Sequence, residues 1–243
     1  DPEFKAIMAK IETPIYYLHS RDTNKAGPRL DAERPMPPMM GARDVAARAK
    51  RGAVVLDSRS GEEFAAAHAT GSLNVPLDGQ YASWVGTLLA PDQEILLIAD
   101  RDRIEEAVMR LARIGYENVA GVLEGGLDAW RAAGLPTGST TQVPAGSLAA
   151  PGRRVLDVRR KREWEEGHLA GAKHIPLAEL PKRAAELDRG AEWAVLCASG
   201  YRSSIGSSVL QRSGFTRVAN AVGGMAACSA AGLPLESGAP AGA

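Results

Sequence analysis

The feature that most constrains this chain is an internal repeat. The segment Leu56–Arg59 (Leu-Asp-Ser-Arg) recurs as Leu156–Arg159 (Leu-Asp-Val-Arg), 100 residues later (157 − 57). The same offset relates four further pairs, His68 and His168, Gly71 and Gly171, Pro76 and Pro176, and Leu77 and Leu177. Gly125-Gly126 recurs as Gly223-Gly224 at an offset of 98 (223 − 125). Chance does not keep such a register, so the chain contains two copies of a unit of about 100 residues.

Each copy alternates buried strands with helices. The apolar runs Ala53–Leu56 and Arg154–Val158 are typical of buried parallel strands, and a helix-like stretch follows each of them. Further apolar runs at Ile95–Ala99 and Trp193–Cys197 are predicted as central strands. Strands that alternate with helices imply a parallel sheet covered on both faces. We therefore predict the α/β class, with two domains that each have a central parallel sheet flanked by helices.

The periodicity lapses between Thr137 and Ala150, where Gly, Ser, Thr, Pro and Ala dominate. We place the domain boundary near Thr140. The predicted division is an N-terminal extension at 1–39, two domains at 40–139 and 140–237, and a disordered tail at 238–243. The Pro-rich segment Glu3–Met40 is expected to belong to neither copy.

Composition narrows the range of partners. Lys plus Arg equals Asp plus Glu at 29 each, so no basic excess favours nucleic acid. No apolar stretch approaches the roughly 18 residues of a membrane-spanning helix, and the N-terminus lacks a signal-peptide pattern. Only Cys197 and Cys228 are present, which argues against a disulfide framework and favours a reducing compartment. We expect a cytoplasmic protein that binds neither nucleic acid nor a membrane.

The chemistry is expected at one turn of the second copy. A predicted strand ends at Cys197, and Ala198–Arg202 lead into a predicted helix. Open α/β sheets place their ligands at the carboxyl ends of strands. The amides of such a loop and the helix N-terminus favour a thiolate over a thiol and hold anions. Gly200 permits a tight turn and Arg202 adds a permanent positive charge, whereas a lone free cysteine is more often a small residue of the core.

The landmarks around this loop resemble the rhodanese family. They are the Cys-x-x-Gly-x-Arg loop itself, Asp157, Arg159, Gly167-His168, Gly171-Ala172 and Pro176 before it, and a Gly-Gly-Met after it. The resemblance is found in both copies, which together make up nearly all of residues 40–236.

What the resemblance implies is transfer of a sulfane sulfur in a ping-pong scheme. The Cys197 thiolate would attack thiosulfate or glutathione persulfide, become a persulfide, and pass the sulfur to cyanide, sulfite or a thiol. The substrate-binding residues would be Ala198, Ser199, Gly200, Tyr201 and Arg202. No metal and no other cofactor is implied, because the sulfur is carried on the protein.

Loop length separates this chemistry from that of phosphatases of similar fold, whose Cys and Arg are separated by five residues. Four residues intervene here, and the smaller ring suits sulfur better than phosphate, so phosphatase and arsenate reductase activities are disfavoured. An alternative of a different class is a non-enzymatic rhodanese-like interaction or regulatory module. The gain of one sulfur atom after incubation with thiosulfate would separate the two.

The first copy lacks the nucleophile. Cys197 aligns with Ala99 or Ile98, depending on where a one-residue shift falls, and this copy contains no cysteine. Asp100 and Asp102 make the turn unfavourable for an anion. We expect the first copy to be structural, packing against its partner or shaping access to the active loop.

Residues that recur in both copies are interpreted as architecture. His68 and His168 are therefore expected to make structural hydrogen bonds rather than to bind a metal. The two Asp-x-Arg motifs are expected to be internal ion pairs or loop anchors, with a weaker possibility that Arg159 adds positive potential near Cys197. Cys228 occupies the position of Trp130, which favours packing over a role as a resolving thiol.

The N-terminal segment carries a second, shorter resemblance. Ile15–Leu18 and Asn24–Pro28 resemble the end of the metallo-β-lactamase-fold module in bacterial persulfide dioxygenase fusions, which carry rhodanese domains downstream. The resemblance implies a persulfide dioxygenase module as a partner, in the same or another chain. Asp1–Phe4 has no initiator Met and is left out of the fold argument.

Overall fold

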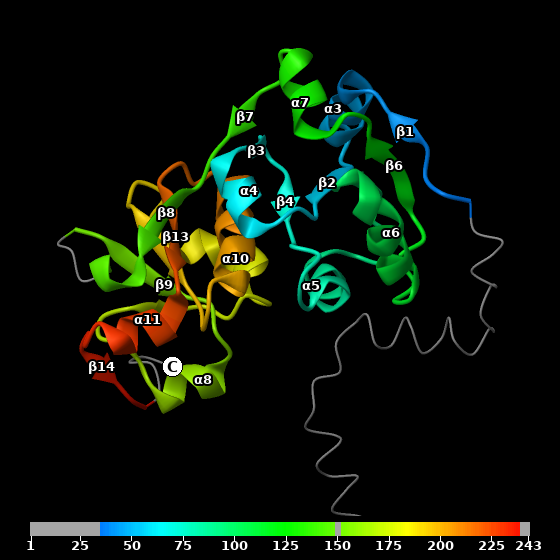
Figure 1. The fold of residues 1–243 in the computed structure, drawn as a ribbon. Coiled ribbons are helices and arrows are strands. Elements are labelled where there is room, and N and C mark those ends of the chain that lie inside the picture. Colours follow the sequence, from blue (N-terminus) through cyan, green and yellow to red (C-terminus); the bar gives the residue numbers. More distant parts are fainter. Residues whose placement is uncertain (1–34, 149–151, 239–243) are drawn as a thin grey trace, which may run out of the picture.

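The computed structural model describes residues 35–148 and 152–238, and Figure 1 shows two α/β lobes in succession along the chain. The N-terminal patches at Ile15–Leu18 and Asn24–Pro28, and the predicted tail after Gly238, lie outside the described residues. The two lobes confirm the predicted α/β class, because each copy forms a five-stranded parallel sheet flanked by helices.

The first copy folds around a sheet in the order β1-β6-β5-β2-β4, in which every neighbouring pair is parallel. Its strands are β1 (Met39–Met40), β2 (Val54–Asp57), β4 (Leu73–Asn74), β5 (Ile95–Ile98) and β6 (Val119–Leu123). Its helices are α3 (Ala42–Lys50), α4 (Gly61–Ala66), α5 (Tyr81–Leu88), α6 (Ile104–Ala112) and α7 (Gly126–Ala132), with a 3-10 turn η2 (Arg101–Arg103) before α6. The residues of β2 and β5 are all buried, as expected for central strands covered on both faces.

The second copy repeats this arrangement. Its sheet has the order β11-β9-β12-β13-β8, again all parallel. The strands are β8 (Thr141–Pro144), β9 (Arg154–Asp157), β11 (Lys173–His174), β12 (Trp193–Leu196) and β13 (Val218–Val222). The helices are α8 (Lys161–Glu166), α9 (Leu180–Arg183), α10 (Tyr201–Arg212) and α11 (Gly224–Ala230), and the 3-10 turns are η3 (Ala145–Ser147) and η4 (Ala184–Glu186).

A short antiparallel strand pair closes the end of each copy. β3 (His68–Ala69) pairs with β7 (Thr137–Gly138) in the first copy, and β10 (His168–Leu169) pairs with β14 (Leu235–Glu236) in the second. The Ala-Gly-Leu-Pro segments that recur in the sequence lead into β7 and β14, so they return the chain to the histidine strand.

The start of the first copy differs from expectation by one residue. Met39 was expected to lie in an N-terminal extension that ends there, yet Met39 and Met40 form β1, which pairs with β6 as β8 pairs with β13 in the second copy. An edge strand of two residues is too short to show the alternation that identifies a strand in a sequence. The first copy therefore begins with an edge strand, just as the second copy does.

The recurring polar residues are structural anchors, as predicted. Asp157 accepts hydrogen bonds from the backbone and the guanidinium of Arg159, and Arg159 also donates to the carbonyl of Gly167 at 2.7 Å. His168 Nδ1 lies 2.9 Å from the carbonyl of Trp164, four residues earlier, and its ring stacks on that indole. Asp57, Arg59 and His68 repeat these contacts in the first copy. The shared motifs fix the turn that follows the first central strand.

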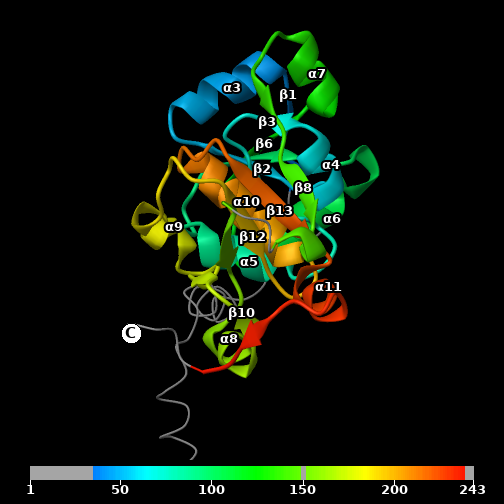
Figure 2. The same cartoon turned by 90° about the vertical axis from the view of Figure 1, so that its left-hand side faces the viewer.

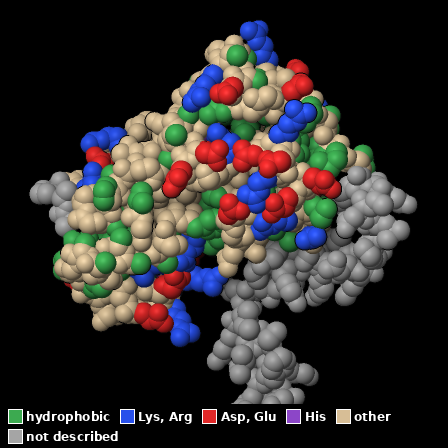
Figure 3. Space-filling view, in the orientation of Figure 1, with side chains coloured by type: hydrophobic (Ala, Val, Ile, Leu, Met, Phe, Trp, Pro, Cys, Tyr) green, Lys and Arg blue, Asp and Glu red, His purple; other side chains and the backbone are tan. Residues whose placement is uncertain are grey.

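The two copies touch along α10. This helix lies beside β4 and α4 of the first copy, as the two perpendicular views show (Figures 1 and 2). The largest buried apolar cluster includes residues of both copies, such as Val54 and Leu97 from the first and Leu156 and Val195 from the second. Acidic and basic side chains are mixed over the face seen in Figure 3. Among the helices of the described part, none is long and apolar enough to cross a membrane.

Candidate functional site

The candidate site begins where β12 ends. All four residues of β12 are buried, and Cys197 follows directly with 1% of its surface exposed. The chain then turns through Gly200, which has a φ of 118° and precedes the first residue of α10. Residues with a side chain rarely adopt this φ, so glycine is required for the helix to start so soon after the strand. The turn places the Cys197 sulfur at the N-terminus of a 12-residue helix.

Two groups of the first helical turn contact the sulfur. The backbone amide of Gly200 donates a hydrogen bond to Cys197 Sγ at 3.1 Å. The thiol in turn lies 3.4 Å from Ser203 Oγ, which donates to the carbonyl of Gly200 at 3.0 Å. An amide donor aimed at sulfur stabilises the thiolate and any negative charge that develops on the sulfur. The sequence pointed to the amide loop but not to Ser203, whose side chain is fully buried beside the thiol.

Arg202 differs from expectation because its charge is already paired. Its guanidinium donates two hydrogen bonds to the carboxylate of Glu163 in α8, at 2.6 and 2.7 Å. These bonds hold the pKa of Glu163 below its usual range, and the same bonds raise the pKa of Arg202. Arg202 therefore ties the loop to α8. Because Glu163 compensates the charge of Arg202, the positive potential of Arg202 at the Cys197 sulfur is weakened.

The start of α11 holds the other side of the loop. The amide of Met225 donates to the carbonyl of Cys197 at 2.8 Å, and that of Ala226 donates to the carbonyl of Ala198 at 3.4 Å. A Cβ atom at Gly224 would lie 2.4 Å from the carbonyl carbon and oxygen of Ala198, so only glycine fits there. The Gly-Gly pair was noticed as a repeat in the sequence, but its contact with the cysteine loop could not be anticipated from spacing.

Two hollows lie on either side of Tyr201, and both copies line each of them. The first, of about 350 Å³, is lined by Gln80 and Trp84 from the first copy and by Arg160, Glu163, Ser199, Tyr201 and Arg202 from the second. The second, of about 320 Å³, includes Ser60, Glu62 and Asp78 from the first copy and Ser199, Gly200 and Asn220 from the second. The predicted loop residues Ser199 to Arg202 thus line these hollows, whereas Ala198 is held against α11.

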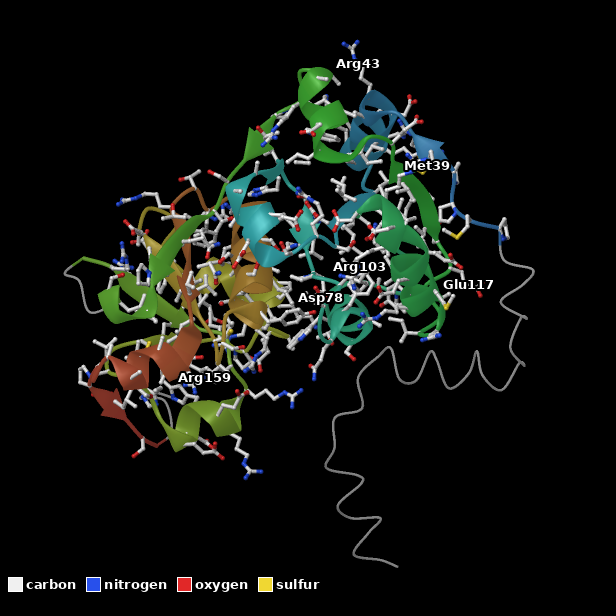
Figure 4. The ribbon with its side chains drawn as sticks, viewed as in Figure 1. Met39, Arg43, Asp78, Arg103, Glu117 and Arg159 are labelled. Atoms are coloured by element: carbon white, nitrogen blue, oxygen red, sulfur yellow. The ribbon has the colours of Figure 1, made fainter. Side chains whose placement is uncertain are left out.

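The corresponding turn of the first copy is built differently. Asp57 pairs with Ile98 in the first sheet and Asp157 with Leu196 in the second, so Ala99 is the counterpart of Cys197. Burial and the neighbouring Glu63 raise the pKa of Asp100. Arg103 forms ion pairs with Asp78 and Glu106, and Figure 4 shows the Arg103 and Asp78 side chains close together. This turn therefore offers carboxylates where the second copy offers a thiol and an amide.

Cys228 is placed as a core residue. Its side chain is fully buried in α11, at the position that Trp130 fills in α7. Burial raises the pKa of the Cys228 thiol, which disfavours the thiolate that exchange chemistry needs. Both cysteines are free. Within residues 35–148 and 152–238, no group of three or more His, Cys, Asp or Glu side chains is arranged to hold a metal ion.

The fold and this loop together define a class. A cysteine at the carboxyl end of a central parallel strand, with an amide of a helix N-terminus on its sulfur, is the arrangement of α/β domains built for thiol chemistry. The model of the rhodanese-like domain matches twice, at residues 41–133 and 145–231, and the chain belongs to this family.

The relatives include proteins named as sulfur carriers and as sulfurtransferases. The relative named "Putative sulfur carrier protein YrkF" of Bacillus subtilis (strain 168) is 44% identical over 71 residues, which are 29% of this chain and 38% of its own length. Thiosulfate sulfurtransferase PspE of Escherichia coli (strain K12) is 34% identical over 28% of this chain and 67% of its own length. The solved thiosulfate sulfurtransferase of Pseudomonas aeruginosa is 29% identical, with a TM-score of 0.37, over 83% of this chain and 44% of its own.

The chain covers only part of the curated relatives that it matches. In three of them it spans 38%, 56% and 39% of the relative's own length. Family membership and the curated relative PspE, which is named a thiosulfate sulfurtransferase, support sulfur transfer as the general class of reaction.

Proposed function

We propose that this chain is a thiosulfate or persulfide sulfurtransferase in which Cys197 carries the sulfur. The observation that carries the proposal is the hydrogen bond from the Gly200 amide to Cys197 Sγ at 3.1 Å, in a loop that the first copy does not share. Sulfurtransferases among the relatives support the reaction class.

The first half-reaction forms a persulfide. The Cys197 thiolate attacks the outer sulfur of thiosulfate, a new S–S bond forms, and the old S–S bond breaks as sulfite leaves with its electron pair. With glutathione persulfide as the donor, the leaving group is the glutathione thiolate. In both cases the proton lost by the Cys197 thiol goes to solvent, and the negative charge comes to lie on the outer sulfur.

The second half-reaction restores the thiolate. A thiophilic acceptor such as cyanide, sulfite or a thiol attacks the outer sulfur and leaves as thiocyanate, thiosulfate or a persulfide, while Cys197 departs as the thiolate. The amide of Gly200 and the N-terminus of α10 stabilise the anionic sulfur in both half-reactions. Arg202 and Glu163 keep the loop in place through their two hydrogen bonds.

The hollows beside Tyr201 support entry of small substrates. Ser199 and Tyr201 line both hollows, and Arg160 at the rim of the first is an exposed cation that attracts anionic donors. A cytoplasmic setting is part of the proposal, because the reaction needs Cys197 reduced between turnovers.

The test is the intact mass of the chain after incubation with thiosulfate, with and without cyanide. We expect one added sulfur atom on the unsubstituted chain, its loss when cyanide is added, and no adduct on Cys197→Ser, whose turnover with either donor should fall more than about 10³-fold. Ala99→Cys in the Cys197→Ser background is the matched control and should stay inactive. An unsubstituted chain that gains no sulfur from either donor would favour the non-enzymatic interaction module instead.

A further inference from the structure

One face of α10 is turned toward the silent first copy. Tyr201, Ser204 and Ser208 are spaced three and four residues apart and so lie on the same side of the helix. Tyr201 donates its hydroxyl proton to the carbonyl of Pro76 at 2.9 Å. Ser208 Oγ accepts a hydrogen bond from the backbone amide of Asn74 at 3.0 Å. The first copy therefore contacts the helix that starts at the cysteine loop, over its first two turns.

Asn74 is the centre of this contact. It lies in β4 and is fully buried. Its Oδ1 accepts a hydrogen bond from Ser204 Oγ at 2.8 Å, while its Nδ2 donates to the carbonyls of Asp57 and Arg59 at 3.0 and 3.1 Å. The side chain is thus fixed at one end by the Asp-x-Arg turn of its own copy and holds Ser204 with the other end. Buried amides that are satisfied on both sides are rigid connectors.

The first copy also leaves room for this approach. A Cβ atom at Gly61 would lie 2.7 Å from Ser204 Oγ, and one at Gly79 would lie 2.9 Å from the ring of Tyr201. The corresponding residues of the second copy are Lys161 and Glu179, at the offset of 100 that relates the two copies (161 − 61). Small residues therefore stand in the silent copy where α10 comes closest.

The neighbouring side of the same helical turn contacts the sulfur. Gly200 and Ser203, which contact Cys197 Sγ, alternate in the sequence with Tyr201 and Ser204, which contact the first copy. A shift of this turn by a few tenths of an ångström would lengthen the amide–sulfur hydrogen bond, and such bonds weaken quickly as their geometry departs from the optimum.

We propose that Asn74, a residue of the silent copy, is a positioning residue for the reaction, because it holds Ser204 and thereby sets the first turn of α10 under the Cys197 sulfur. The proposal rests on the proposed function. It gives the first copy a task in the chemistry although it has no nucleophile of its own.

The counterpart of Asn74 makes the asymmetry plain. His174 occupies the same place in β11, and its Nε2 lies 2.8 Å from the carbonyl of Arg159, as Asn74 lies beside Arg59. The ring of His174 stacks on Trp164 of its own copy. One position thus supports the Asp-x-Arg turn in both copies, and only in the first copy does it also reach a catalytic helix.

The experiment measures kcat and KM for thiosulfate, together with the alkylation rate of Cys197 by iodoacetamide as a function of pH, in the full chain. Peptide mass spectrometry separates Cys197 from Cys228. For Asn74→Ala and for Ser204→Ala we expect kcat to fall about tenfold with a smaller change in KM, and the alkylation profile to move to higher pH. The double variant should lose no more than Asn74→Ala alone, because Asn74→Ala already removes the hydrogen bond to Ser204.

Arg212→Ala is the matched control. Arg212 donates a hydrogen bond to the carbonyl of Gly71 at 2.7 Å. Its substitution therefore removes another contact between α10 and the first copy, at the far end of the helix. It should lower the melting temperature without moving kcat or the alkylation profile.

The outcomes separate the two proposals. If Asn74→Ala and Ser204→Ala alter kcat and the alkylation profile no more than Arg212→Ala does, the positioning role is wrong. If Asn74→Ala does not fold, Ser204→Ala decides the matter alone, since alanine preserves the helix. If the unsubstituted chain transfers no sulfur, the proposed function fails, and the alkylation profiles still report whether Asn74 positions the Cys197 sulfur.

Discussion

The turn at Ala99 and the turn at Cys197 occupy the same place in two copies of one fold. Each follows a fully buried central strand and lies beside an Asp-x-Arg anchor of the same geometry. The second turn has a thiol with an amide on its sulfur, whereas the first has a methyl group followed by a carboxylate whose pKa is raised. The comparison teaches that the same scaffold is present with and without a cysteine at this turn, and that the surroundings of the thiol are set by a small number of contacts made by the loop.

The two glycine pairs sharpen this point. Gly126 and Gly224 have the same φ of 58°, and each is the first residue of the last helix in its copy. A Cβ atom at Gly126 would meet nothing within 4 Å, but one at Gly224 would overlap the backbone of Ala198. In the first copy, the left-handed backbone of this glycine serves only to start the helix. In the second copy, the same conformation also lets α11 approach the cysteine loop.

The largest effect is expected from Gly224→Ala. The substitution should destabilise the second copy by about 3 kcal/mol and lower persulfide formation more than tenfold, because the backbone of the cysteine loop has to move. Gly126→Ala should cost only about 1 kcal/mol, from the left-handed backbone alone, and leave turnover unchanged. Chemical denaturation and the thiosulfate assay measure both. Equal losses in the two variants would mean that the contact between Gly224 and Ala198 has no part in the loop's geometry.

A smaller effect should follow from Glu163→Gln. Removing this carboxylate leaves the Arg202 charge uncompensated, so the thiolate of Cys197 becomes more favourable and its alkylation at neutral pH should rise about threefold. Because the pKa of Glu163 is lowered in the folded state, its stabilising pair is present above its unfolded pKa and is lost as the pH falls through the folded pKa.

Glu63→Gln is the matched control for this prediction. Glu63 accepts hydrogen bonds from Ser60 at the start of α4, as Glu163 accepts one from the backbone of Arg160, but the first copy offers it no guanidinium like that of Arg202 in the described contacts. Its substitution should leave the alkylation of Cys197 unchanged. A threefold rise in both variants would point to a long-range field rather than to the Arg202 pair.

The smallest effect is expected from the histidine of the first copy. Burial lowers the pKa of His68, so its stabilising contribution is complete above the unfolded pKa and is lost as the pH falls toward the folded pKa. His68→Asn, which can still donate to the carbonyl of Phe64, should flatten the pH dependence of the unfolding free energy between about pH 7.5 and 5.5.

A His68→Asn variant whose unfolding free energy depends on pH as steeply as that of the unsubstituted chain would contradict this prediction.

Much of the fold could be predicted because the repeat shows the pattern of each element twice. The predicted strands that begin near Val54, Ile95, Arg154 and Trp193 are all present, and the helices follow in the expected order. The structural roles of the histidines and of the Asp-x-Arg motifs were also predicted correctly, because most of their contacts are local, two to four residues apart, and the longest reach a carbonyl eight residues on.

The parts that could not be predicted depend on contacts distant in sequence. Arg202 meets Glu163 from 39 residues away, and Ser204 meets Asn74 from 130 residues away. The serine-rich α10 also lacks the apolar stripe by which a buried helix is normally recognised. Its surroundings, rather than its own sequence pattern, bury it.

The burial of α10 has a consequence for how this chain can change over generations. Eight successive residues of the helix, Ser203 to Leu210, are buried, and part of that cover comes from the first copy. A copy that contains no cysteine can vary at the turn around Ala99, but not at the strand edge around Asn74, where it covers α10. A recombination event that separated the two copies would leave the copy that holds Cys197 with an uncovered helix beside its sulfur.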